Sequence, residues 1–178
     1  MNQPEFSHII KIADIGVGQS HLKLVANEEQ RAALAERFDL LSLDSLEADI
    51  ALSRESRGIL AEGTFRAKLE QACIATGDPV PANMDEPVRI LFVPEPADAA
   101  DTEVELDADD CDTMFYDGQN IDVGEAIAQS LGLALDPYPR SASAEAALKK
   151  AGVISEEAAQ AESGPFGALA SLKDKLKK

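Results

Sequence analysis

The sequence predicts an α+β protein: an antiparallel β-sheet, open or barrel-like, with packed helices and an amphipathic C-terminal helix. Residues 46–52 and 59–69 alternate apolar and polar side chains, as strands with one solvated face do. Helical spacing of apolar residues follows helix-start signals near residues 27 and 122. With 178 residues, of which 45% are hydrophobic and only 4% aromatic, the chain can bury an aliphatic core without disulfides.

Shorter signals place the remaining elements of the first half. Residues 6–12 and 21–25 resemble short strands, and Asn27 is a suitable N-cap for a helix that runs to about Arg37. The turn at residues 55–58, ESRG, joins the two alternating segments into a hairpin.

Two further segments follow the hairpin. The sequence GDPVPANMDEP at residues 77–87 indicates a proline-rich connection. Residues 88–93, VRILFV, are apolar on both faces, which predicts a strand in the middle of the sheet.

Negative charge is concentrated in one region. The formal net charge is −17, and between Arg89 and Arg140 there are 13 acidic residues and no Lys or Arg. Residues 95–118 lack sustained periodicity and are expected to form a mobile acidic loop. Such a field repels phosphate backbones and attracts basic proteins.

A well-delimited helix follows the acidic region. Asp122 is the predicted N-cap, with Glu125 three residues later as in a capping box, and Gly132 is the predicted C′ residue. The sequence DPYPR at residues 136–140 ends the helix. This segment is interpreted either as a rigid loop over the sheet or as a preorganised contact site consisting of Pro137, Tyr138, Pro139 and Arg140.

The predicted domain organisation is a core at residues 1–140, followed by an Ala-rich linker and a basic helix at 141–178. Helical pieces are expected at residues 145–150 and 156–161, and Pro165 begins the last helix. Its candidate contact residues are Pro165, Phe166, Leu169, Leu172 and Lys173. This helix either docks on its own core or binds a protein groove or rRNA phosphates.

Residue types that carry catalysis are sparse, so we expect no enzymatic activity. Cys73, Cys111, His8 and His21 show no spacing typical of a metal site or a nucleophile–base pair. We therefore expect no cofactor and no metal. The sequence shows no secretory signal and no apolar stretch long enough for a membrane span, so we expect a cytoplasmic protein. We also expect it to be a monomer.

Several segments, in order, resemble the YceD family of large ribosomal RNA subunit accumulation proteins. They are ERFDLLSLDSL from Glu36, EGTFRAKLEQACIATGDPV from Glu62, LFVP from Leu91, IDVGEAIAQSLGLALDPYPR from Ile121 and GPFGALASLK from Gly164. Many relatives carry a second cysteine three residues after the position of Cys73, where this chain has Thr76. A metal or redox role based on a cysteine pair is therefore not carried over.

The resemblance implies a role in 23S rRNA accumulation and large-subunit assembly. The implied partner is a large-subunit ribosomal protein or a pre-ribosomal particle, bound through the acidic segment, the helix-start residues Asp122 and Glu125, the 137–140 segment and the C-terminal helix. The alternative is direct binding to 23S rRNA through the basic C-terminal tail.

Overall fold

The computed structural model describes residues 4–16, 18–95, 112–116 and 118–153. The chain divides into two compact units, of which the larger comprises residues 1–72 and 79–137 and the smaller comprises residues 73–78 and 138–178. The larger unit contains two sheets and the helices α1 (Glu28–Arg37) and α2 (Val123–Ala134). The smaller unit contains α3 (Ala144–Lys150), which confirms the helical piece predicted at residues 145–150.

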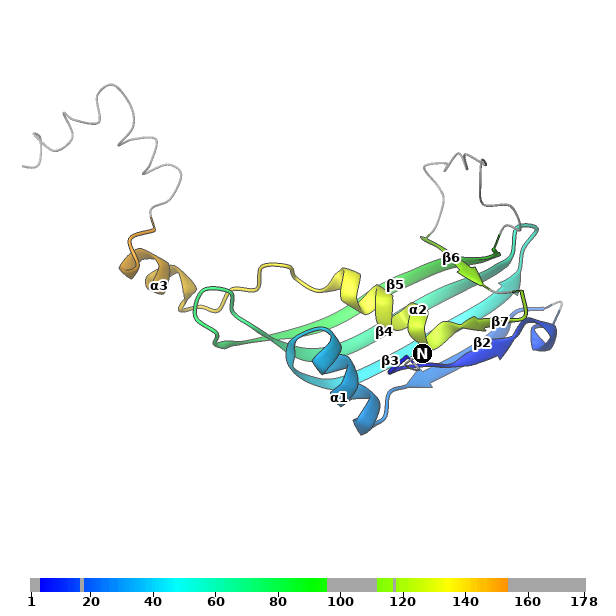
Figure 1. Ribbon diagram of the computed structural model, residues 1–178, viewed down its shortest axis with the longest axis horizontal. Coiled ribbons are helices and arrows are strands. Elements are labelled where there is room, and N and C mark those ends of the chain that lie inside the picture. The colour runs from blue at the N-terminus through cyan, green and yellow to red at the C-terminus, as the bar shows by residue number, and fades with distance from the viewer. Residues whose placement is uncertain (1–3, 17, 96–111, 117, 154–178) are drawn as a thin grey trace, which may run out of the picture. The chain divides into compact units, whose positions relative to one another are not determined.

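The main sheet of the larger unit is five-stranded and mostly antiparallel (Figure 1). In spatial order its strands are β2 (Ser20–Val25), β3 (Leu40–Arg54), β4 (Ile59–Ala72), β5 (Pro79–Pro94) and β6 (Asp112–Tyr116). Only β5 and β6 are parallel. Because β2 and β6 stay at opposite edges, the described sheet is open, and the barrel-like alternative is not realised.

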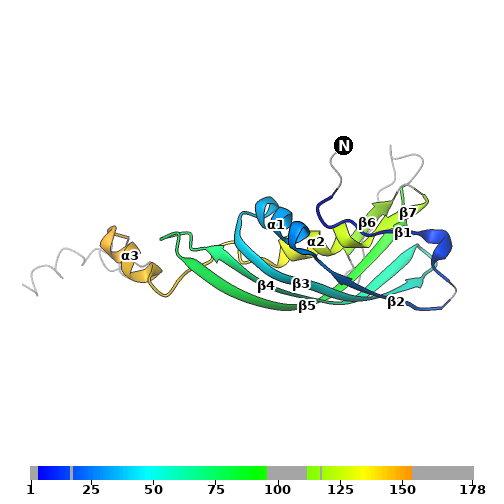
Figure 2. The same cartoon turned by 90° about the horizontal axis from the view of Figure 1, so that it is seen from below.

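The concave face of this sheet is covered and its convex face is solvated. The helices α1 and α2 lie over the concave face, together with a two-stranded sheet formed by β1 (Ile9–Lys11) and β7 (Asn120–Asp122) (Figure 2). A 3₁₀ turn at Ile12–Asp14 follows β1. No helix in the described part of the chain is long and apolar enough to cross a membrane.

The predicted central hairpin is confirmed. Glu55 and Gly58 exchange backbone hydrogen bonds of 2.9 and 3.3 Å at the turn between β3 and β4. The inward-facing side chains are almost fully buried, among them Ile50 and Phe65. On the outer face, charged residues pair across strands, as Arg66 does with Asp85 at 3.0 Å. The alternation of apolar and polar residues therefore predicts correctly which side chains of β3 and β4 are buried and which are exposed.

The predicted proline-rich connection at residues 77–87 is wrong, because most of it belongs to β5. Pro79, Pro81 and Pro87 occupy alternate positions in the strand, so their backbones face the same side of it. β6 pairs only with Ile90–Pro94, which leaves that side of the preceding residues at the sheet edge. A missing N–H is tolerated there because no neighbouring strand requires it.

The predicted mobile loop at residues 95–118 is also partly wrong. Residues 112–116, DTMFY, form β6, and Met114 and Tyr116 pack against the core. Burial of these side chains orders a strand in a segment whose composition is otherwise acidic. Residues 96–111 lie outside the described part of the chain.

Strand limits in the first half also differ from those predicted. The strand expected at residues 6–12 is confined to β1, because a 3₁₀ turn follows it at once. The strand expected from residue 46 begins earlier, at Leu40. Asp39 adopts a φ of 53°, a left-handed conformation that aspartate tolerates, and it redirects the chain from α1 into β3.

Both predicted N-caps are confirmed. The Asn27 side chain accepts a hydrogen bond from the Gln30 backbone N–H, and the Asp122 side chain accepts one from that of Glu125. The predicted end of the second helix at Gly132 is wrong, since α2 continues to Ala134. A Cβ at Gly132 would lie 2.8 Å from the Phe38 ring, so this glycine makes room for α1 rather than ending α2.

Candidate partner-binding surface

The first turn of α2 is fastened to the N-terminal segment. Ile121 and Val123 are buried on either side of the N-cap. A Cβ at Gly124 would lie 2.2 Å from the Phe6 carbonyl oxygen and 2.7 Å from the His8 backbone nitrogen. Only a residue without a side chain allows this approach, so the glycine of the sequence IDVGE is required by packing.

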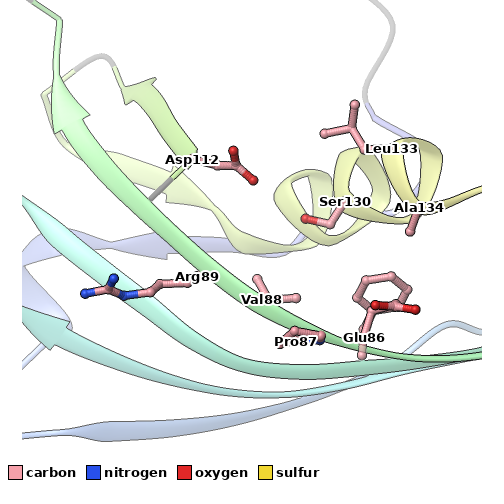
Figure 3. A pocket seen from close by; sticks show the side chains of 9 residues that line it. Glu86, Pro87, Val88, Arg89, Asp112, Ser130, Leu133 and Ala134 are labelled. Carbon is pink, nitrogen blue, oxygen red and sulfur yellow. The ribbon is translucent and has the colours of Figure 1, made fainter. Parts of the chain in front are cut away.

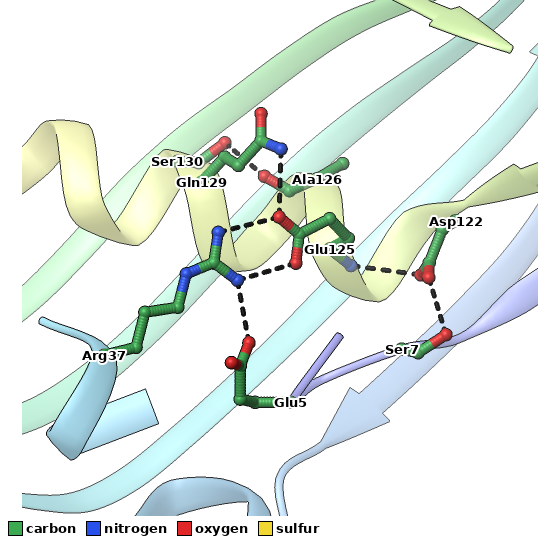
Figure 4. A network of polar contacts seen from close by, with 8 residues as sticks. All are labelled: Glu5, Ser7, Arg37, Asp122, Glu125, Ala126, Gln129 and Ser130. Carbon is green, nitrogen blue, oxygen red and sulfur yellow. Dashed lines mark hydrogen bonds and ion pairs between the residues drawn. The ribbon is translucent and has the colours of Figure 1, made fainter. Parts of the chain in front are cut away.

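Asp122 joins three groups at this end of the helix. Its carboxylate accepts hydrogen bonds from the Ser7 hydroxyl at 2.6 Å and the Glu125 backbone N–H at 3.1 Å (Figure 4). It also accepts one from the His8 backbone N–H at 2.7 Å. The residue thus caps α2 and fixes the chain that precedes β1. Charge-assisted hydrogen bonds of this kind are stronger than those between neutral groups.

Glu125 is held by an arginine from the end of α1. The Arg37 guanidinium donates two hydrogen bonds of 2.8 Å to the Glu125 carboxylate and one of 2.9 Å to Glu5 (Figure 4). Gln129 donates a further bond to Glu125 at 3.0 Å. The bonds from Arg37 lower the pKa of Glu125 against the opposing effect of burial. The carboxylates of Asp122 and Glu125 are thus engaged within the chain, and their predicted role in partner binding stays a prediction.

A groove lies at the opposite end of α2, between this helix, β5 and the first residue of β6 (Figure 3). Its volume is about 220 Å³. The lining residues are Phe65, Glu86, Pro87, Val88, Arg89, Asp112, Ser130, Leu133 and Ala134. Leu133, at 81% exposure, is the most exposed large hydrophobic side chain of the described residues. The groove therefore combines an apolar lining with open access to solvent.

The polar side chains of this groove favour a positively charged ligand. Neither Glu86 nor Asp112 has a hydrogen-bond or ion-pair partner within the described residues. The Ser130 hydroxyl donates to the Ala126 carbonyl at 3.0 Å, which leaves its oxygen able to accept. The Arg89 side chain extends away from α2 and pairs with Glu62 at 3.0 Å (Figure 3). The side chains that face the groove are therefore acceptors without a matching donor.

The smaller unit joins the loop at residues 73–78 to the segment before α3. The Ile74 backbone N–H donates to the Pro139 carbonyl at 3.0 Å. Asp78 accepts hydrogen bonds from the hydroxyls of Thr76 at 2.9 Å and Ser143 at 2.6 Å. Thr76 is thus part of a hydrogen-bonded loop.

Cys73 is buried in the same unit. Hydrogen bonds to its sulfur, chiefly from the hydroxyl and backbone of Ser141 and from the hydroxyl of Thr76, lower the pKa of the Cys73 thiol to about 6. Within the described residues, no group of three or more His, Cys, Asp or Glu side chains is placed to hold a metal ion.

The predicted contact residues after α2 differ in exposure. Pro137, Tyr138 and Arg140 are exposed, with Tyr138 at 69%, whereas Pro139 is buried and its carbonyl is used within the chain. The predicted contact residues of the C-terminal helix lie outside the described residues; they are Pro165, Phe166, Leu169, Leu172 and Lys173.

Sequence reasoning missed the groove, although a signal for it was present. Ala82, Met84, Val88 and Ile90 lie on the inward-facing side of β5, and Glu86 shares their parity. A carboxylate in an otherwise apolar stripe marks a gap in the covering layer. The signal was hidden because the prolines concealed the strand itself.

Comparison with protein families identifies one match. The family described as "Large ribosomal RNA subunit accumulation protein YceD" matches residues 61–173. This range covers the second strand of the hairpin, β5, β6, α2 and α3. No curated protein and no solved structure shows a match.

Proposed function

Since the chain belongs to the YceD family of large ribosomal RNA subunit accumulation proteins, we propose that it is a non-enzymatic factor for large-subunit assembly that binds a basic ribosomal protein. Binding would keep that protein soluble and deliver it to the assembling particle, and 23S rRNA would accumulate because the particle is completed. The acidic segment at residues 95–118 and the C-terminal helix are the proposed contact regions.

The observation that carries this proposal is the charge distribution. A net charge of −17 on 178 residues attracts basic proteins over a range of about 8 Å at physiological salt. The 13 acidic residues between Arg89 and Arg140 include no compensating Lys or Arg. A ribosomal protein rich in Lys and Arg is the kind of partner that this field attracts.

Internal pairing of basic side chains supports the same conclusion. The positive charges of the larger unit are largely used inside it: Arg37 binds Glu5 and Glu125, Arg66 binds Asp85, and Arg89 binds Glu62. Arg31 and Arg54 donate to backbone carbonyls. The field presented to a partner is therefore dominated by carboxylates.

The test is a tagged pull-down from growing cells, with and without nuclease, in which both proteins and RNA are identified. We expect large-subunit ribosomal proteins to remain bound after nuclease treatment. Loss of every ribosomal protein on nuclease treatment would overturn the protein-partner proposal and favour direct rRNA binding through Arg140, Lys149, Lys150 and the terminal lysines. RNA titrations would then show a steep fall of affinity with salt.

A truncation tests the contribution of the C-terminal helix. We expect deletion of residues 164–178 to abolish function, because these residues carry the proposed hydrophobic and basic contacts. The measurement is the 23S rRNA level in a null strain that expresses the truncated chain. Normal 23S rRNA levels, with the truncated protein folded by circular dichroism, would show that the helix is dispensable.

A further inference from the structure

We propose that the groove between β5 and the C-terminal half of α2 binds an arginine or lysine side chain from an extended basic segment of the ribosomal-protein partner. This inference rests on the proposed function and adds a specific receptor site to it. The site consists of Glu86, Asp112, Ser130 and Leu133, with Pro87 and Val88 in its wall. Of these residues, only Asp112 belongs to a contact region suggested by the sequence, because it lies within the acidic segment at residues 95–118.

The first argument is the position of Glu86. It lies on the inward-facing side of β5, opposite Phe65 in the β4–β5 register, yet it is exposed. Its neighbours on that face, Met84 and Val88, are partly or fully buried. A solvated carboxylate on an otherwise apolar face is a position at which a cation can be paired, and no basic side chain of the described residues pairs with Glu86.

The second argument is the match between the groove and the shape of a basic side chain. Long basic side chains lay their methylene stems on apolar surface while the charged head reaches polar partners. The exposed side chains of Leu133 and Ala134 offer such a surface, and Glu86, Asp112 and the Ser130 oxygen offer acceptors. A guanidinium, with five donors and no acceptor, complements Glu86, whereas Asp112, beside Ile90 and four strand positions farther along β5, is placed for a second basic side chain of the same segment. An anionic or phosphate ligand would face repulsion from both carboxylates.

The third argument is the absence of an internal competitor. Arg89 lines the groove, but its guanidinium is bound to Glu62 on the outer face of the sheet. By contrast, Glu125 at the other end of α2 already holds Arg37 through two bonds of 2.8 Å. The arrangement at Glu125 shows the kind of pairing that Glu86 lacks within the described residues.

The experiment uses the full-length ¹⁵N-labelled chain and a capped peptide, Gly-Arg-Leu-Lys-Arg-Gly, titrated by NMR. A matched peptide with citrulline and norleucine in place of arginine and lysine removes the charge. We expect shifts centred on residues 86–89 and 130–134, and none with the neutral peptide. Shifts spread over the acidic segment alone, with the groove unchanged, would overturn the proposal.

Paired variants separate the groove from general electrostatics. The double variant Glu86→Gln, Asp112→Asn should weaken peptide binding roughly ten- to hundredfold, because it removes two charged acceptors. The control Glu29→Gln, Asp49→Asn makes the same change in net charge at exposed positions on α1 and the outer face of β3. Equal weakening in both double variants would overturn the proposal. If Asp112→Asn disturbs β6, the peptide affinity of the single variant Glu86→Gln is compared with that of the single control Asp49→Asn.

A second pair tests the apolar contact. Leu133→Ser should weaken binding severalfold, whereas Leu41→Ser, at a leucine that is 51% exposed on β3, should leave it unchanged. The same variants are then used to capture purified large-subunit ribosomal proteins. If the wild type and Glu86→Gln capture the same amount of a ribosomal protein, the groove is rejected as its binding site but the proposed function is kept. No capture by the wild type would reject the proposed function itself.

Discussion

Carboxylates lie near both ends of α2, but their hydrogen bonding is opposite. At the start of the helix, Asp122 and Glu125 accept hydrogen bonds from Ser7, His8, Arg37 and Gln129. At its end, Glu86 and Asp112 line a groove without a partner among the described residues. The first set fixes the fold, and the second is available for a ligand. The difference shows that a conspicuous motif need not supply the available carboxylates, even when both sets lie beside one helix.

The largest expected effect concerns the glycine at the start of α2. Gly124→Ala should destabilise the protein by roughly 3 kcal/mol, since a Cβ 2.2 Å from the Phe6 carbonyl forces backbone atoms apart. Urea unfolding followed by circular dichroism measures the change. Gly18→Ala is the matched control, because a Cβ there meets nothing within 4 Å. A stable Gly124→Ala variant would mean that the N-terminal segment is not fastened to α2.

The N-cap gives the next largest effect. Asp122→Ala should cost roughly 2 kcal/mol, because it removes the cap and leaves the Ser7 hydroxyl and the His8 N–H without their acceptor. Asp112→Ala, at the other end of the comparison, should change the free energy of unfolding by no more than about 0.5 kcal/mol. Similar losses of unfolding free energy in Asp122→Ala and Asp112→Ala would show that the two carboxylates do not differ in their contribution to the fold.

The ion pair between α1 and α2 is expected to contribute less, and its contribution depends on pH. Glu125→Gln should cost about 1 kcal/mol at pH 7, since the pair is partly exposed, with Arg37 at 30% and Glu125 at 16%. Hydrogen bonds from Arg37 hold the pKa of Glu125 below its ordinary value of 4.5. A carboxylate with a lowered folded pKa stabilises the fold above its unfolded pKa, and this stabilisation is lost as the pH falls through the folded value.

Unfolding free energies should therefore converge in acid. The difference in free energy of unfolding between the wild type and Glu125→Gln should shrink as the pH falls below about 5. Denaturant unfolding of both proteins between neutral and acidic pH measures this. A difference in free energy of unfolding that stays constant from neutral to acidic pH would show that Arg37 does not bind the ionised Glu125 carboxylate.

The smallest expected effect is at Glu86. Glu86→Gln should leave the free energy of unfolding within about 0.5 kcal/mol of the wild type, because the carboxylate has no partner to lose among the described residues. The comparison predicts that this variant loses binding without losing stability, whereas Glu125→Gln does the reverse. A large loss of stability in Glu86→Gln would assign the groove a structural role.

Sequence patterns predicted the fold best where the local signal and the tertiary contacts agree. The hairpin of β3 and β4, the two N-caps and the inward-facing side of β4 follow from alternation and capping chemistry. The strand character of residues 79–87 could not be read, because proline is excluded from a central strand but allowed at an edge. Which strand lies at an edge is a property of the assembled sheet.

The same limit applies to the candidate site. Asp122 and Glu125 were singled out correctly as a helix start, but their partners Ser7 and Arg37 come from distant segments. Gly132 was interpreted as a helix end because the Phe38 ring that requires it lies almost a hundred residues earlier in the chain. The parallel pairing of β6 with β5 also depends on tertiary contacts rather than on local sequence.

The prolines of β5 have a consequence for the behaviour of the protein at high concentration. A second molecule that laid its own β5 edge alongside this one would present carbonyl oxygens to positions 79, 81 and 87, where no N–H is available to meet them. Edge-to-edge polymerisation of the sheet is thus disfavoured, although the strand is 16 residues long. The chain can in this way keep a long strand beside the sheet edge and still resist fibril formation.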